Sequence, residues 1–178
     1  MRTTLRGESG TTIIEVVIAS GILVTLMAGL MSLGGLAIST TENQGHLAAR
    51  TTEYAQDKME QLMALSYGDN ATDTRQFPAL AAGGSGLAVG GSSSTSSPVA
   101  LYVDYLDQFG NLCGSTGAEC VAPVGTTPPA SWFYQRCWQV TQSAANLKQI
   151  TVTATIARGF GGAMKASSTL TVLKTNPF

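Results

Sequence analysis

The chain has 178 residues, of which 12% are charged, and its formal net charge is −1. This length suits one modest domain, with or without an extension. The charge balance supplies no basic surface of the kind that binds nucleic acid, so we expect no nucleic-acid partner. The only histidine is His46, and the three cysteines lack C-x-x-C spacing. These counts argue against a Cys/His zinc site, and we expect neither a metal nor a cofactor.

The N-terminal third begins with a short polar stretch and continues as a long apolar run. Residues 1–10 read MRTTLRGESG, and no charged residue occurs from Val16 to Thr41. That run is longer than the roughly 20 residues that cross a hydrocarbon core, and it exceeds the apolar stretch of an ordinary secretory signal. The sequence therefore predicts a membrane-spanning helix over 11–41. The arginines before it favour a cytoplasmic N-terminus and an external C-terminus.

Glu15 lies just inside the apolar run. A carboxylate in lipid is energetically costly, so an acidic residue at this place is a candidate functional residue. The alternative is a plain signal anchor, which has no evident need for this side chain.

The segment GTTIIEVVIASGIL (10–23) resembles the N-terminal motif of type IV prepilins and type II secretion pseudopilins. In that motif a glycine ends the leader and a glutamate is the fifth mature residue. The resemblance covers about the first third of the chain. It implies that residues 1–10 are a leader cleaved between Gly10 and Thr11, that the new amine is a candidate for methylation, and that Glu15 acts in filament assembly. The family usually has phenylalanine at the first mature position, where this chain has Thr11.

Apolar side chains continue at helical spacing beyond the apolar run. They recur every three or four residues at Leu47, Thr51, Tyr54, Ala55, Met59, Leu62 and Met63. This spacing predicts an amphipathic helix over 42–66, continuous with the first segment because no proline precedes Pro78. Its end, DKMEQLMALSYGD (57–69), resembles the same helix in minor pilins of the pilus-modification group and in a minor pseudopilin. We expect His46 to be an exposed residue of this helix.

Residues 67–98 read as a loop that is rich in glycine and serine, most clearly over 83–97. Asp69, Asn70 and Asp73 could suggest a calcium loop. They lack the required D-x-[DN]-x-[DN]-G pattern, so the sequence favours a helix-ending turn.

The remaining residues, 99–178, predict a β-sheet head. Four strands are expected at 99–106, 131–143, 146–158 and 167–174, the last following a glycine turn at 159–162. Ile150, Val152, Ala154 and Ile156 alternate with polar residues, which indicates one face on a core and one toward water. The last three strands should form an antiparallel meander whose apolar face packs on the amphipathic helix. The expected class is α+β.

The cysteines leave more than one pairing open. Cys113 and Cys120 are close in sequence and lie in a glycine-containing loop, so we favour a disulfide between them. Cys137 lies within an expected strand and is the alternative partner of either one.

No catalytic constellation is visible, and we expect that the protein is not an enzyme. Asp104 and Asp107 lie beside an expected turn, where we interpret them as solvated or turn-forming residues. Tyr134, Arg136 and Trp138 are interpreted either as an adhesive surface or as ordinary strand residues.

The resemblance implies a minor type IV pilin, inserted in the bacterial inner membrane with its head in the periplasm or outside and then assembled into a pilus or at its tip. Its partners would be a prepilin peptidase, other pilin or pseudopilin subunits, the inner-membrane assembly platform and, before assembly, the lipid bilayer. Two alternatives stay open. One is a minor pseudopilin of a type II secretion system, and the other is a signal-anchored periplasmic binding domain that does not polymerise.

Overall fold

A computed structural model describes residues 12–79, 81–157 and 165–176. The chain divides into two units, Met1–Glu42 and Asn43–Phe178. The expected leader at 1–10, Thr11 and the expected turn at 159–162 lie outside the described residues.

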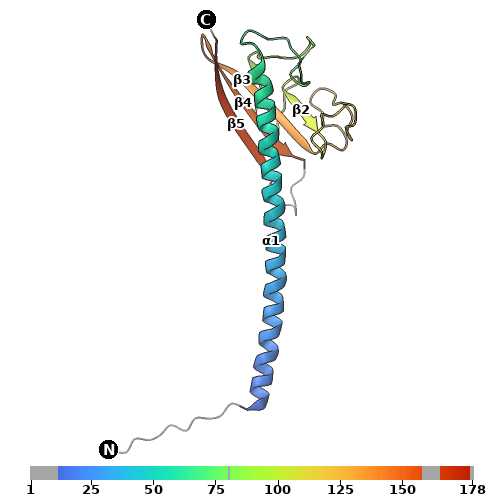
Figure 1. Ribbon diagram of the computed structural model, residues 1–178, viewed down its shortest axis with the longest axis vertical. Helices are drawn as coiled ribbons and strands as arrows, with labels where there is room; N and C mark the ends of the chain where they lie inside the picture. The colour runs from blue at the N-terminus through green and yellow to red at the C-terminus, as the bar shows by residue number, and fades with distance from the viewer. Residues whose placement is uncertain (1–11, 80, 158–164, 177–178) are drawn as a thin grey trace, which may run out of the picture. The chain divides into compact units, whose positions relative to one another are not determined.

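One helix runs through the N-terminal third (Figure 1). Helix α1 spans Ile13–Ala64, 52 residues without a break, against the predicted 11–66. Proline is absent from this stretch, so no backbone donor is lost along it. After the helix, the Asp69 carboxylate accepts hydrogen bonds from the N–H groups of Ala71 and Thr72, at 3.1 and 3.0 Å. This is the helix-ending turn that the sequence predicted.

The head contains one antiparallel sheet. Its strands are β1 Gly90–Gly91, β2 Val103–Leu106, β3 Tyr134–Ala144, β4 Leu147–Ile156 and β5 Ser167–Thr175. The order is β1-β3-β4-β5, and β2 also pairs with β3. Strands β3, β4 and β5 lie side by side as the predicted meander (Figure 1). The architecture is therefore α+β.

Two features of the sheet differ from expectation. Strand β2 begins at Val103 instead of 99, because Leu101 has a φ of 70° and the left-handed region cannot continue a strand. Strand β1 lies inside the segment that was expected to be loop. Its two glycines have positive φ, and a Cβ on Gly91 would lie 2.4 Å from the Trp138 carbonyl oxygen, so only glycine fits against β3.

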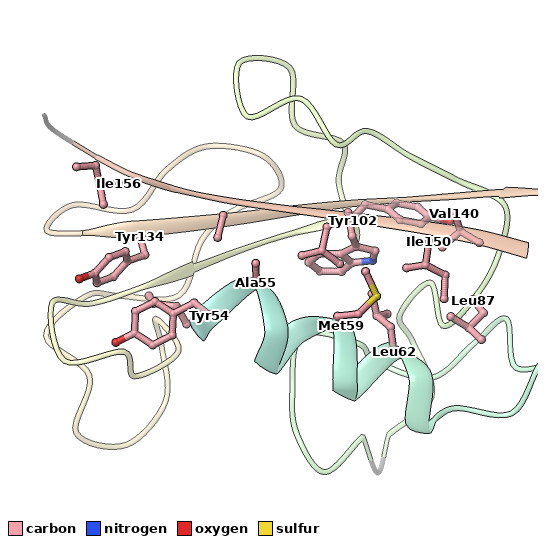
Figure 2. Close-up of a cluster of buried hydrophobic side chains, with 14 residues drawn as sticks. Tyr54, Ala55, Met59, Leu62, Leu87, Tyr102, Tyr134, Val140, Ile150 and Ile156 are labelled. Carbon is pink, nitrogen blue, oxygen red and sulfur yellow. The ribbon is translucent and has the colours of Figure 1, made fainter. Parts of the chain in front are cut away.

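The core lies between the sheet and the last part of α1 (Figure 2). Tyr54, Ala55, Met59 and Leu62 point from the helix toward the sheet. The sheet side supplies Tyr102, Leu106, Tyr134, Trp138, Val140, Ile150, Val152, Ala154 and Ile156. The even-numbered residues of β4 thus face the core, as the period-two pattern predicted. Burial of such side chains contributes roughly 1.5–3 kcal/mol each.

The opposite face of the sheet is less exposed than the alternation suggested. A second cluster forms there from Val103, Tyr105, Cys113, Cys120 and Cys137. The expectation that the threonine side of β4 faces water is wrong at Thr153 and Thr155, which are only 8% and 6% exposed. Their hydroxyls are satisfied, because Thr153 Oγ1 pairs with Thr169 Oγ1 at 3.0 Å and Thr155 Oγ1 donates to the Ala166 carbonyl oxygen at 3.2 Å.

Candidate functional site

The first half of α1 is an apolar helical segment whose side chains are exposed. Within the described residues, α1 is the single helix that is long and apolar enough to cross a membrane, with a mean hydropathy of 2.3 over its best window. Its large apolar side chains are exposed, up to 85% at Ile13. An apolar surface this extended is unfavourable in water, which is consistent with a membrane anchor.

The hydroxyl groups of this segment are paired internally. Ser20 donates to the Val16 carbonyl oxygen at 2.7 Å, and Ser32 donates to that of Gly29 at 2.8 Å. Thr25 bonds the Gly21 and Ile22 carbonyl oxygens in the same way. Such back-bonding to the preceding turn hides donors that would otherwise be costly in an apolar environment.

Glu15 lies in the first turn of α1 and is exposed. It is the one ionisable side chain between Ile13 and Thr41. Its carboxylate contacts no donor among the described residues, although the N-terminal end of a helix favours a negative charge. Gly10 and Thr11 lie outside the described residues, so the leader cleavage stays a prediction. His46 is exposed on α1, as expected.

The head holds one disulfide and one free thiol. Cys113 and Cys120 are bonded, with their Cα atoms 4.8 Å apart. Cys137 is a buried free cysteine on β3, so neither pairing with Cys137 occurs in the structure. Burial raises the pKa of the Cys137 thiol to about 12, which keeps it protonated and unreactive near neutral pH.

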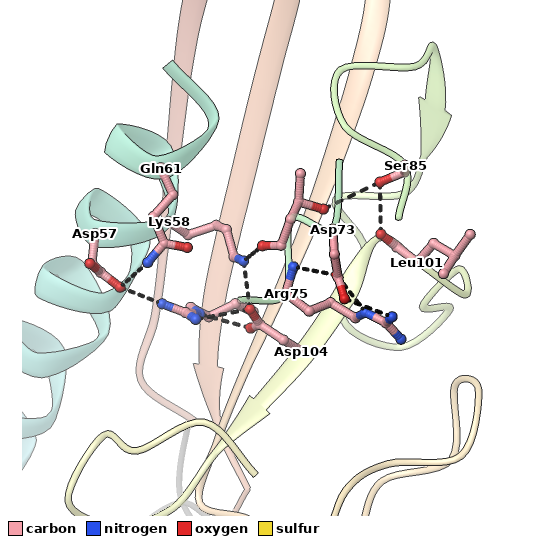
Figure 3. Close-up of polar contacts among 10 residues, drawn as sticks. Asp57, Lys58, Gln61, Asp73, Arg75, Ser85, Leu101 and Asp104 are labelled. Atoms are coloured by element: carbon pink, nitrogen blue, oxygen red, sulfur yellow. Dashed lines mark hydrogen bonds and ion pairs between the residues drawn. The ribbon is translucent and has the colours of Figure 1, made fainter. Parts of the chain in front are cut away.

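An ion cluster joins α1 to the sheet (Figure 3). Asp104 on β2 pairs in register with Arg136 on β3. Arg136 Nε and Nη2 donate to its two oxygens at 2.7 and 2.8 Å. From the helix, Lys58 Nζ lies 2.7 Å from Asp104 Oδ2. Arg136 Nη1 also donates to Asp57 Oδ2 at 2.7 Å. Four charged residues therefore connect the helix to the sheet. We call them the ion cluster: Asp57, Lys58, Asp104 and Arg136.

Burial sets the electrostatics of the ion cluster. The side chains of Lys58, Asp104 and Arg136 are each at most 4% exposed, whereas Asp57 is half-exposed. Burial lowers the pKa of Lys58 to about 8, although Asp104 opposes the shift. Burial alone would raise the pKa of Asp104, but Arg136 and Lys58 outweigh it and hold that pKa below its ordinary value. The Asp104 carboxylate therefore stays ionised and compensates the buried positive charges of Lys58 and Arg136.

These positions correct two interpretations. Asp104 is neither solvated nor a turn residue, because it lies on the core side of β2 between Tyr102 and Leu106. Asp107 does form a turn, accepting N–H bonds from Phe109 and Asn111, but it is buried, not solvated.

Tyr134, Arg136 and Trp138 cannot form an adhesive surface, since all three are buried. The Tyr134 ring packs edge-on against Tyr54 at 4.6 Å, and the Lys58 ammonium lies 4.3 Å from the centre of the Trp138 ring. They are core-facing strand residues.

Reasoning from the sequence missed Lys58 and the ion cluster as a whole. The alternation held a usable signal: Asp104 falls two residues from Tyr102 and Leu106, and Arg136 falls two from Tyr134 and Trp138. In a strand this spacing places each charge on the core-facing side. Two opposite charges on core faces are expected to pair.

A groove with a volume of about 780 Å³ opens beside the ion cluster. One side includes Asp57 and Gln61 of α1, and the segment 73–77 and the loop around the disulfide supply further lining residues. Arg75 is held by Asp73 through bonds of 3.0 and 3.1 Å. All lining residues of the groove belong to the unit Asn43–Phe178.

No group of three or more His, Cys, Asp or Glu side chains that could hold a metal occurs within 12–79, 81–157 and 165–176. Comparisons with protein-family models, with curated proteins and with solved structures find no match to this chain.

Proposed function

We propose that this chain is a type IV pilin-like subunit, a minor pilin whose N-terminal helix anchors it in the inner membrane and then packs into a filament. The observation that carries the proposal is Glu15, the one carboxylate in the first turn of α1, within an exposed apolar segment (13–41) that carries no other charge. Lipid alone gives this charge no partner. A neighbouring subunit can supply one.

The physical logic requires a cleaved N-terminus. Cleavage after Gly10 would create an α-amino group on Thr11, four residues before Glu15. In a filament core, that amine of one subunit and the Glu15 carboxylate of another would neutralise each other. Removing one partner of a buried ion pair costs about 3–5 kcal/mol, so Glu15 would select one register between subunits.

The other properties of α1 suit both a lipid and a protein environment. The serine and threonine hydroxyls of the apolar segment bond to the preceding turn of their own helix. They therefore place no unsatisfied donor on the surface, and small residues such as Gly21 and Gly29 have open space around them. Small residues let helices approach closely in an apolar medium.

The first test is the mature N-terminus. The chain is expressed with an active prepilin peptidase or with an inactive variant of it, and the intact mass is measured. We expect loss of residues 1–10 only with the active enzyme. An uncleaved chain with the active enzyme refutes the proposal and supports a signal-anchored domain.

The second test is assembly. Glu15→Gln keeps the size and polarity of the side chain but removes its charge. We expect normal membrane insertion and cleavage, and at least a roughly hundredfold loss from the sheared filament fraction. Glu42→Gln is the matched control, an exposed acid on the same helix beyond the apolar run. Equal assembly of the wild type and Glu15→Gln would exclude the proposed role.

A further inference from the structure

The groove beside the ion cluster is a candidate ligand site that is independent of filament assembly. Its volume of about 780 Å³ falls in the range of pockets that hold small ligands. Six of its lining residues carry the argument: Asp57, Gln61, Asp73, Arg75, Gln76 and Phe77. Figure 3 shows that Asp57 and Gln61 come from α1, and that Asp73 and Arg75 lie across from them.

The charges of the groove are already balanced. Asp104 and Asp57 are paired with Arg136, Asp104 is also paired with Lys58, and Asp73 is paired with Arg75. Three carboxylates thus meet three cations. A charged ligand finds no uncompensated opposite charge here, so the electrostatics favour a neutral one.

The groove nevertheless offers both donors and acceptors. Asp57 uses Oδ2 for Arg136 and Gln61, and among the described residues nothing bonds its Oδ1. Arg75 uses Nε and Nη2 for Asp73, which leaves Nη1 to donate. The Gln76 amide is exposed and can do both. Hydroxyl groups also donate and accept, so a polyhydroxylated ligand matches this pattern.

The groove also has an aromatic surface. Phe77 lines it and is 66% exposed, which is costly for a phenyl ring unless something covers it. The C–H face of a sugar ring is a flat, weakly apolar surface that can cover a phenyl ring while its hydroxyls reach neighbouring polar groups.

Taken together, the balanced charges, the mixed donors and acceptors and the exposed ring lead us to propose that this groove binds a neutral oligosaccharide. The ring of one sugar stacks on Phe77, and its hydroxyls bond Asp57, Arg75 and Gln76. Asp57, Asp104 and Arg136 of the ion cluster also line the groove, and Arg136 holds both carboxylates in place through three hydrogen bonds of 2.7–2.8 Å.

The test uses the full chain in a zwitterionic detergent that contains no sugar. Maltotetraose, cellotetraose, chitotetraose and lacto-N-tetraose are titrated separately, with a heparin tetrasaccharide as an anionic comparison. Binding is measured by calorimetry and by saturation-transfer NMR. We expect saturable binding of at least one neutral tetrasaccharide and weaker binding of the anionic one.

Two phenylalanines provide a matched pair of variants. Phe77→Ala should weaken binding about fivefold or more. Phe109 is equally exposed at 66% but does not line the groove, so Phe109→Ala should leave the affinity unchanged. Both side chains are exposed, and circular dichroism should show both variants folded. No binding of any of the four neutral probes, tighter binding of the heparin fragment, or equal loss in both variants would overturn the proposal.

Discussion

Removal of the Asp104 carboxylate should destabilise the head more than any other single charge change. Asp104→Ala leaves Lys58 without its carboxylate and Arg136 with only Asp57, while both cations stay buried. The wild-type carboxylate accepts three charged contacts of 2.7–2.8 Å. Leaving a buried charge without its partner lowers the free energy of unfolding by about 3–5 kcal/mol. A domain of this size loses about 3 °C in Tm per kcal/mol, so we expect a drop of roughly 10–15 °C.

The assay is thermal and urea unfolding of the full chain, followed by circular dichroism in the β-sheet region. Glu53→Ala is the control, because it breaks the exposed Arg50–Glu53 pair and should cost less than about 1 kcal/mol. The triple variant Lys58→Met, Asp104→Leu, Arg136→Met removes every buried charge of the ion cluster at once. It should be markedly more stable than Asp104→Ala. If Asp104→Ala matched Glu53→Ala, the cluster would not stabilise the head as argued.

Three further predictions concern pH, core packing and the disulfide. Because the folded pKa of Lys58 is about 8 and its ordinary value is 10.5, the unfolded chain binds more protons between these values, and stability should rise with pH there. Cys137 opposes this trend above pH 9, since its folded pKa is about 12, so the slope is measured by urea unfolding in a Cys137→Ala background. Lys58→Met should reduce this slope without abolishing it, because burial also lowers the pKa of Lys148 and Lys174. Leu62→Ala should cost about 2–5 kcal/mol in urea unfolding, whereas Met63→Ala, one residue along and partly exposed, should cost far less. Reduction of the Cys113–Cys120 disulfide should lower stability by about 2–3 kcal/mol, and Cys113→Ser should abolish that response to reductant.

Much of the fold could be predicted because the signals are local. The alternation at Ile150, Val152 and Ala154 located β4 and its core face, and the three- to four-residue spacing of Tyr54, Met59 and Leu62 located the packed face of α1. Both patterns depend only on the geometry of one element.

Features that depend on two elements were not predictable in this way. Strand β2 begins later than expected because Leu101 takes a positive φ, and nothing in the residue type predicts this φ. Thr153 and Thr155 are buried on the face of the sheet where Tyr105 and the disulfide cysteines form the second cluster, and their hydroxyls bond Thr169 and Ala166. Period two gives the two faces of a strand but not what covers each face.

Glu15 and Lys58 show the same limit for charged residues. Each is an ionisable group next to apolar neighbours, and its charged form is energetically costly there without a partner. The cost of Glu15 can be read along the chain, since the apolar run around it leaves no other charge from Ile13 to Thr41. Lys58 stands among Asp57, Glu60 and Gln61 and reads as the solvated side of a helix. Its burial results from packing of α1 against β2 and β3. There Lys58 pairs with Asp104, which also pairs with Arg136. A charge within an apolar run can therefore be identified as a candidate from the sequence, whereas a charge within an amphipathic helix becomes one only when the facing strands are known.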